Sequence, residues 1–141
     1  TDDGANVEIR KLVGDDNFFL FGMDEPQVAA LGAKGYHPGE YYESDPLLKA
    51  TLDLIASGTF SNGDHQTFEP VVSNLVHNDR FMALADFTSY IEAQAKVDAA
   101  YADTEAWTRS AILNVARCGF FSSDRSMKDY IKLIWGTNPV L

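Results

Sequence analysis

Cysteine is nearly absent from the sequence, since Cys118 is the only one in 141 residues. A lone cysteine cannot close an internal disulfide, which excludes the class of small disulfide-stapled secreted domains and favours a reducing compartment. Basic residues are also scarce, with 11 against 21 acidic residues and a net charge of −10. Because binding to phosphates needs clustered Lys and Arg, the composition disfavours nucleic acid as a partner.

Long apolar stretches are missing too. The uninterrupted run Phe18–Phe21 is far shorter than the roughly 20 apolar residues that a membrane-spanning helix needs. It is also too short for the core of a signal peptide, so no membrane partner is expected. Tracts of Pro, Gly or Ser are absent, while 45% hydrophobic and 12% aromatic residues exclude disorder. We expect residues 1–141 to form one compact soluble region.

Helix signals dominate the sequence from residue 45 onward. Asp45 followed by Pro46 is typical of an N-cap with proline at the first helical position, and apolar residues recur at helical spacing until Gly58. Four more amphipathic helices are predicted from similar signals, beginning at Thr67, at Asp86, at Thr104 and at Ser122 or Ser123. The helix from Thr104 is expected to end at Gly119, and the last helix at Gly136.

The first 35 residues show a different pattern. A short helix is predicted over Asn6–Leu12, and a capping box predicts another over Asp24–Leu31. Between them, the unbroken apolar run Phe18–Phe21 is typical of a strand buried on both faces, as in a parallel sheet covered by helices. Phe81–Leu84 is a second strand candidate.

One or two strands cannot form a stable sheet alone, because each needs neighbours on its edges and a layer on each face. Either the strand prediction at Phe18–Phe21 is wrong, or its partner strands lie upstream of this chain. Residue 1 is Thr rather than Met, which favours the second explanation and predicts a piece of a longer protein.

The three histidines give no metal signal. His37, His65 and His77 are far apart, without an i,i+4 pair or a cysteine cluster. We interpret His65 as a solvated loop residue and His37 as a turn residue. His77 is placed at a helix C-terminus, where an imidazolium would meet unsatisfied carbonyls.

Other reactive residues have structural explanations. Gly32, Gly35 and Gly39 match no phosphate-binding pattern and are explained by turns. The pair Glu40 and Glu43 is expected to be solvated surface, although sequence cannot establish the spacing that paired carboxylates need in glycoside cleavage. Cys118 precedes a helix-ending glycine, where the dipole raises a thiol pKa, so it is interpreted as a small packed residue.

The segment Phe121–Arg125 reads Phe-Ser-Ser-Asp-Arg at a helix start. Two hydroxyls and a carboxylate suit a helix cap, whereas an anion site in the same place would suffer repulsion from Asp124. The cap is the favoured interpretation. The residues therefore predict an acidic, helix-rich chain with a remnant of a parallel sheet, and no catalytic, cofactor-binding or metal site residues.

Several blocks resemble the α-glucan phosphorylases, the family of glycogen, starch and maltodextrin phosphorylases. Asp3–Ile9 is similar to the family's D-G-A-N-V-E block, and Asn17–Met23 is similar to the N-F-F-x-F-G block that follows it. Further matches occur in family order at 35–36, 40–42, 55–58, 79–81, 85–87, 90–92, 107–109, 112–117 and 121–125. Together they cover essentially the whole chain, so the resemblance is identified from many blocks rather than from one.

The resemblance implies an α/β fold. Residues 1–141 would be the C-terminal portion of the second, Rossmann-like domain of a GT-B glycosyltransferase, with upstream strands and the N-terminal domain missing. The implied full-length enzyme is cytoplasmic and homodimeric. It would cleave terminal α-1,4-linked glucose from a glucan with orthophosphate and release glucose 1-phosphate.

The resemblance also implies a pyridoxal phosphate cofactor, held by the lysine of a G-T-G-N-M-K motif. That motif is absent, because the six lysines, at 11, 34, 49, 96, 128 and 132, all lie outside such a sequence. The family's lysine would fall shortly before Thr1, together with the residues that bind glucan and phosphate. This chain is therefore expected to be a structural scaffold that is inactive alone.

Two positions depart from the family pattern. Asp2 stands where a leucine is usual, and Phe120 stands where a basic residue is common before Phe121–Arg125. A different class of function stays open as an alternative: a free-standing acidic helical interaction module without catalysis. A fragment is expected to expose a large apolar face, which an independent module would cover.

Overall fold

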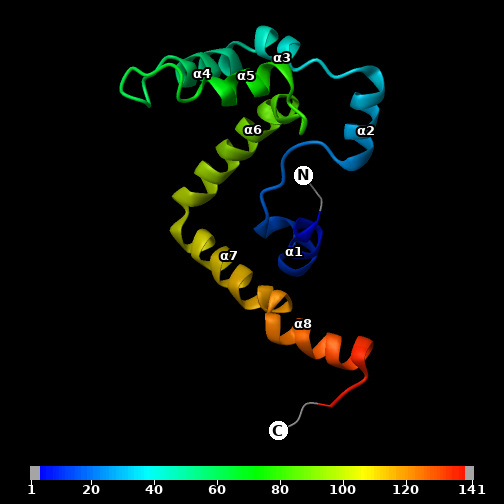
Figure 1. Ribbon diagram of the computed structural model, residues 1–141. Coiled ribbons are helices and arrows are strands. Elements are labelled where there is room, and N and C mark those ends of the chain that lie inside the picture. The colour runs from blue at the N-terminus through cyan, green and yellow to red at the C-terminus, as the bar shows by residue number, and fades with distance from the viewer. Residues whose placement is uncertain (1–3, 139–141) are drawn as a thin grey trace. The chain divides into compact units, whose positions relative to one another are not determined.

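The computed structural model describes residues 4–138 and contains helices joined by short loops (Figure 1). Two predicted features, the block start at Asp3 and the departure at Asp2, lie outside the described residues. The α-helices are α1 (Ala5–Val13), α2 (Glu25–Lys34), α3 (Pro38–Ser44), α4 (Pro46–Ala56), α5 (Glu69–His77), α6 (Ala83–Ala102), α7 (Thr104–Arg117) and α8 (Ser123–Asp129). Short 3₁₀ turns occur at η1 (Asp15–Asn17) and η2 (Cys118–Phe121), and η3 (Tyr130–Trp135) is a π-helix.

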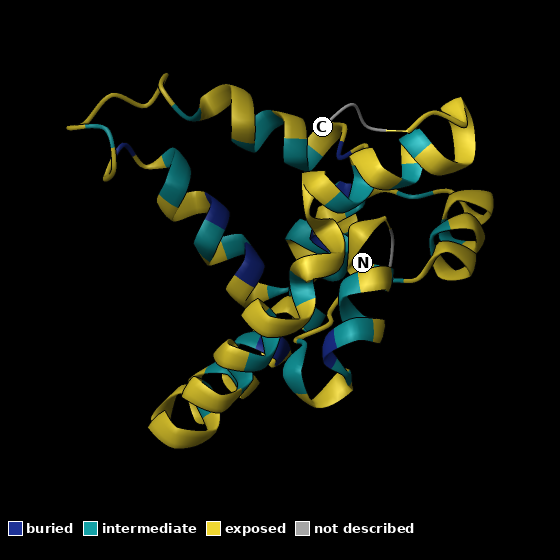
Figure 2. Ribbon diagram, turned by 90° about the horizontal axis from the view of Figure 1, so that it is seen from below, coloured by how far each residue is buried: buried dark blue, intermediate teal, exposed yellow. Residues whose placement is uncertain are grey.

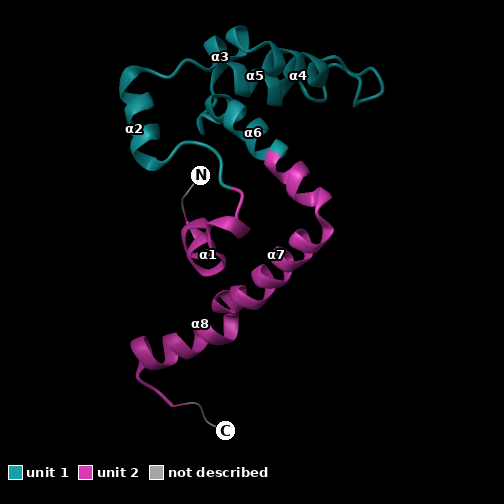
Figure 3. Cartoon of the chain, turned by 180° about the vertical axis from the view of Figure 1, so that it is seen from behind, with its two compact units in different colours: residues 1–3, 20–95 teal, residues 4–19, 96–141 magenta. Residues whose placement is uncertain are grey.

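The chain divides into two compact units (Figure 3). In the described residues, unit 1 is 20–95 and contains α2 to α5 with the first part of α6. Unit 2 joins residues 4–19 to 96–138, and it contains α1, η1, the end of α6, and the elements from α7 to η3.

The core of unit 1 lies where α3, α4, α5 and the start of α6 meet. Leu48 and Leu52 on α4 and Leu84 on α6 are buried, and half-buried side chains from α3 and α5 pack against them. Figure 2 shows how few positions in the chain are buried. In unit 2, Val13 is fully buried, and Arg117 Nη1 donates to its carbonyl at 3.1 Å.

The helix caps confirm part of the prediction. Asp45 accepts the amides of Leu47 and Leu48 at 2.9 and 3.1 Å, which fixes the start of α4. Asp24 and Gln27 form the expected capping box at α2. Gly136 ends η3 in the left-handed conformation, as the sequence predicts for the last helix.

Two other predicted helix starts, at Thr67 and Asp86, are wrong. Thr67 does not begin α5, because its hydroxyl donates to Asp64 instead. The predicted start of α7 at Thr104 is confirmed, and Asp103 caps it by accepting the amide of Ala106 at 3.0 Å. Asp86 lies inside α6, which begins at Ala83 because the Asp79 carboxylate accepts the first amides of that helix.

Both predicted strands are absent from the described residues, so the α/β expectation is not met within 4–138. Phe18 has an extended backbone, but no other strand is present within residues 4–138 to pair with it. The aromatic residues of this stretch pack on helices: Phe19 stacks on Trp107 in unit 2, and Phe21 meets the Tyr90 ring edge-on in unit 1. The second candidate, Phe81–Leu84, is a turn followed by the first residues of α6.

Candidate functional site

An open groove on unit 1 brings together residues that are far apart in the sequence. It has a volume of about 860 Å³ and lies between α3, α5 and the loop that precedes α5. Glu40 and Glu43 come from α3, Glu69 begins α5, and His65 and His77 come from the loop and the end of α5. We call its aliphatic lining residues, Ala56, Val72 and Val76, the floor; the half-buried Ser73 lines the groove beside them.

Helix geometry explains the floor of the groove. Val72 and Val76 are four residues apart on α5, so their side chains lie on one face of the helix. Both are half-buried and pack against the core of unit 1. The apolar floor is therefore an extension of the core rather than a separate cluster.

Two of the three carboxylates occupy helix positions that favour negative charge, and the third is paired with a lysine. Glu40 and Glu69 lie in the first turns of α3 and α5, where the helix dipole is positive. Glu43 lies in the last turn of α3, and its Oε2 accepts a hydrogen bond from Lys49 Nζ at 2.8 Å. No lysine or arginine side chain is among the residues that line the groove.

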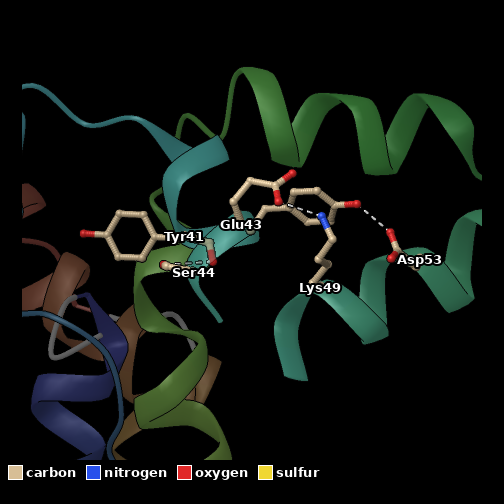
Figure 4. Close-up of polar contacts among 6 residues, drawn as sticks. Tyr41, Glu43, Ser44, Lys49 and Asp53 are labelled. Carbon is tan, nitrogen blue, oxygen red and sulfur yellow. Dashed lines mark hydrogen bonds and ion pairs between the residues drawn. The ribbon is translucent and has the colours of Figure 1, made fainter. Parts of the chain in front are cut away.

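Tyr42, which lines the groove, belongs to a polar cluster with Glu43, Lys49 and Asp53. Figure 4 shows the last three of these side chains. The Tyr42 hydroxyl donates to Asp53 Oδ1 at 2.5 Å, and Lys49 Nζ lies 4.1 Å from the centre of its ring. The hydrogen bond to Asp53 raises the Tyr42 pKa, and the hydrogen bond to Glu43 raises the Lys49 pKa. The contact with Glu43 therefore keeps Lys49 protonated. The Lys49 side chain covers one face of the Tyr42 ring.

The loop before α5 is organised by its own side chains. Asp64 accepts the amide of Gln66 at 2.8 Å and the hydroxyl of Thr67 at 2.8 Å, and the first of these bonds is the main reason that the Asp64 pKa is lowered. His65 Nδ1 lies 3.1 Å from the carbonyl of Ala56. A carbonyl only accepts, so Nδ1 donates and Nε2 of the neutral ring is left as an acceptor.

Asp79 is the buried carboxylate of unit 1, with 3% of its surface exposed. It accepts the amides of Ala83 and Leu84 at 3.0 and 2.8 Å, and the Tyr36 hydroxyl at 2.5 Å. Burial raises the pKa of Tyr36, with the bond to Asp79 as the next cause. Its partners at the start of α6 explain Asp79 as a helix cap, so it is not a free catalytic group.

The other residues considered as candidates in the sequence have structural roles. Most of them lie away from the groove. His37 precedes α3 at its N-cap position without a side-chain cap bond, and Gly39 lines the groove. Gly32 lies within α2, and Gly35 follows it with a positive φ of 89°. Cys118 is a half-buried free thiol in unit 2.

The Phe121–Arg125 segment forms the start of α8, where Ser122 has the N-cap position but makes no side-chain cap bond. Instead, Arg125 donates to the carbonyl of Phe120 and pairs with Asp129. The guanidinium also lies over the Phe120 ring, 3.9 Å from its centre. The expected side-chain cap is thus replaced by arginine contacts.

The groove was not predictable from sequence, because its residues are joined only by the packing of α3 against α5. The histidines and the Glu40–Glu43 pair are evident in the sequence, but nothing in their spacing indicates that they share a surface. Within residues 4–138, no group of three or more His, Cys, Asp or Glu side chains is arranged to hold a metal ion. No helix in the same residues is long and apolar enough to cross a membrane.

Comparison with known proteins identifies the family. Residues 1–137 match the model of the carbohydrate phosphorylases, and the chain belongs to this family. Glycogen phosphorylase of Synechocystis sp. is 50% identical over 139 residues, which is 99% of this chain and 16% of that protein.

Glycogen phosphorylases from an animal and from another bacterium are similar to this chain as well. The brain form of glycogen phosphorylase from Mus musculus is 45% identical over 99% of this chain and 16% of its own length. Glycogen phosphorylase of Haemophilus influenzae is 44% identical over 98% of this chain and 17% of its own length. The chain spans about one sixth of the length of these relatives.

Proposed function

We propose that residues 1–141 are a scaffold segment of an α-glucan phosphorylase, the C-terminal portion of its second GT-B domain. The observation that carries the proposal is the 50% identity, across 99% of the chain, to a protein named glycogen phosphorylase. The full-length protein would transfer a terminal α-1,4-linked glucosyl unit from a glucan to orthophosphate and release glucose 1-phosphate. It would work in the cytoplasm as a homodimer.

In this proposal Phe18–Phe21 regains strand pairing from the rest of the domain. The support is its extended start and its unbroken apolar character. Three side chains remain largely in solvent, Phe81 at 84%, Val115 at 81% and Leu133 at 75% exposed. Exposed apolar residues of this size favour a fragment over a free-standing interaction module.

The residues of this chain do not fit a pyridoxal phosphate site. A lysine that forms a Schiff base must lose its proton, which burial in an apolar pocket promotes. Lys49 instead pairs with Glu43, and the other five lysines, at 11, 34, 96, 128 and 132, are exposed. We therefore assign catalytic, cofactor-binding and glucan-binding residues to the rest of the polypeptide and none to 1–141.

The reaction is tested on the full-length protein. Incubation with maltoheptaose and orthophosphate should release glucose 1-phosphate, and omission of orthophosphate should abolish that product. Release of free glucose instead would identify a hydrolase and contradict the proposed reaction. The isolated chain, assayed at the same molar concentration, should release neither product.

A further inference from the structure

The acidic groove of unit 1 presents hydrogen-bond acceptors around an apolar floor. Three carboxylates, from Glu40, Glu43 and Glu69, line it; Glu43 is already paired with Lys49, which leaves Glu40 and Glu69 to face a ligand. His65 also lines the groove, and its Nδ1 lies 3.1 Å from the carbonyl of Ala56. A ligand that complements this surface must bring donors and positive charge together with an apolar face.

We propose that this groove binds an amphipathic helix of a separate protein, with apolar residues on one face and Lys or Arg beside them. Its apolar side chains would pack on Val72 and Val76, which form an i,i+4 stripe along α5. Its basic side chains would pair with Glu40 and Glu69.

The lining disfavours a glucan as the occupant. Sugar rings pack on open aromatic faces, and Tyr42 is the aromatic residue that lines the groove. One face of its ring is covered by Lys49, whose Nζ is 4.1 Å from the ring centre. The floor itself is aliphatic, which suits leucine-like side chains better than sugar hydroxyls.

The layout of the groove also favours a reversible partner over a permanent internal interface. An apolar centre with a charged rim is the anatomy of a non-obligate protein interface. A permanent interface would bury Glu40 and Glu69, for which no ion pair is present among residues 4–138. Burying such carboxylates permanently carries a desolvation penalty.

The test uses the full-length protein and a fluorescein-labelled 18-residue peptide of Leu and Lys, with Leu at i, i+3, i+4 and i+7. Fluorescence anisotropy at low salt should give saturable binding. The double variant Glu40→Gln and Glu69→Gln should weaken it about tenfold, as expected for the loss of two rim charge pairs. A peptide with the same composition and scrambled order should bind at least tenfold more weakly.

A matched control removes two exposed carboxylates elsewhere on unit 1, in the double variant Glu25→Gln and Glu92→Gln. It loses the same net charge but should change affinity less than twofold. Circular dichroism and thermal unfolding of both double variants check that folding is retained. Equal weakening by the two double variants would overturn the proposal, because it would mean attraction to net charge alone.

Hydrogen exchange of the full-length protein locates the peptide independently of affinity. Binding should slow exchange in segments 39–43 and 69–77. If these segments are protected already and do not respond to peptide, the groove is covered by the rest of the polypeptide or a second copy, and the proposal fails. It also fails if maltoheptaose displaces the peptide and protects the same segments, which would assign the groove to a glucan.

Discussion

Gly22 occupies a position that no other residue fits without rearrangement. Its φ is +86°, and a Cβ built there would lie 2.7 Å from Asp86 Oδ2. The Asp86 carboxylate is itself held, because Oδ1 accepts the amide of Met23 at 2.9 Å. The amide of Gly22 donates to Ser89 Oγ, so the segment before α2 is tied to α6 by two adjacent hydrogen bonds.

We predict that Gly22→Ala destabilises the full-length protein by about 2–4 kcal/mol, because left-handed strain adds to the displaced Asp86 contact. Gly63→Ala is the matched control, since Gly63 has a φ of +87° and an open surrounding. It should cost only about 1–2 kcal/mol. Urea unfolding of the two variants measures the difference, and equal losses would show that the Asp86 contact carries no energy.

Tyr36 should make the stability of the folded protein decrease at alkaline pH. Its pKa is raised in the folded protein by burial and by Asp79, so the neutral hydroxyl is favoured by folding. The stabilisation is complete below the ordinary tyrosine pKa of about 10 and is lost as the pH rises above it, because the unfolded chain then ionises first.

The wild type should therefore exceed Tyr36→Phe in unfolding free energy by about 1–2 kcal/mol at pH 8. The gap should narrow progressively above about pH 10. Urea titrations of both proteins from pH 8 to 11 measure it. A gap that is constant over this range would contradict the role assigned to the Tyr36 hydroxyl.

At the scale of elements, local chemistry determined some helix boundaries and tertiary contacts determined others. The starts of α2 and α4 were predictable because Asp24 and Asp45 bond amides within three residues. The start of α6 was not predictable, because Asp79 and Asp86 are both residues that commonly cap helices. Only the Asp79 carboxylate accepts the amides of Ala83 and Leu84 at the start of the helix. The strand predicted at Phe18–Phe21 does not form within residues 4–138, because a strand needs a partner strand to bond with.

The cap of α4 gives a prediction at this scale. Asp45→Ala should destabilise α4 by about 1 kcal/mol because the amides of Leu47 and Leu48 lose their acceptor. Asp45→Asn is the control, since asparagine caps about as well, and it should cost little. Hydrogen exchange at residues 47–49 in the full-length protein measures the local loss. Equal protection in the alanine and asparagine variants would show that the cap is not stabilising.

For the whole molecule, exposed apolar residues support the proposal that the chain is part of a larger fold. Phe81, Val115 and Leu133 are each at least 75% exposed. We predict that residues 1–141, expressed alone, self-associate and bind a dye for exposed apolar surface. Sedimentation and fluorescence measure this. A monomer with a single cooperative unfolding transition would instead support the free-standing interaction module.

We propose that this chain supports a phosphorylase whose cofactor chemistry lies elsewhere in the polypeptide. Reduction of the full-length protein with borohydride fixes a pyridoxal phosphate Schiff base to its lysine, and peptide mass spectrometry then locates the label. We expect one labelled lysine, outside residues 1–141. A stoichiometric label on Lys49 or on any other lysine of this chain would contradict it.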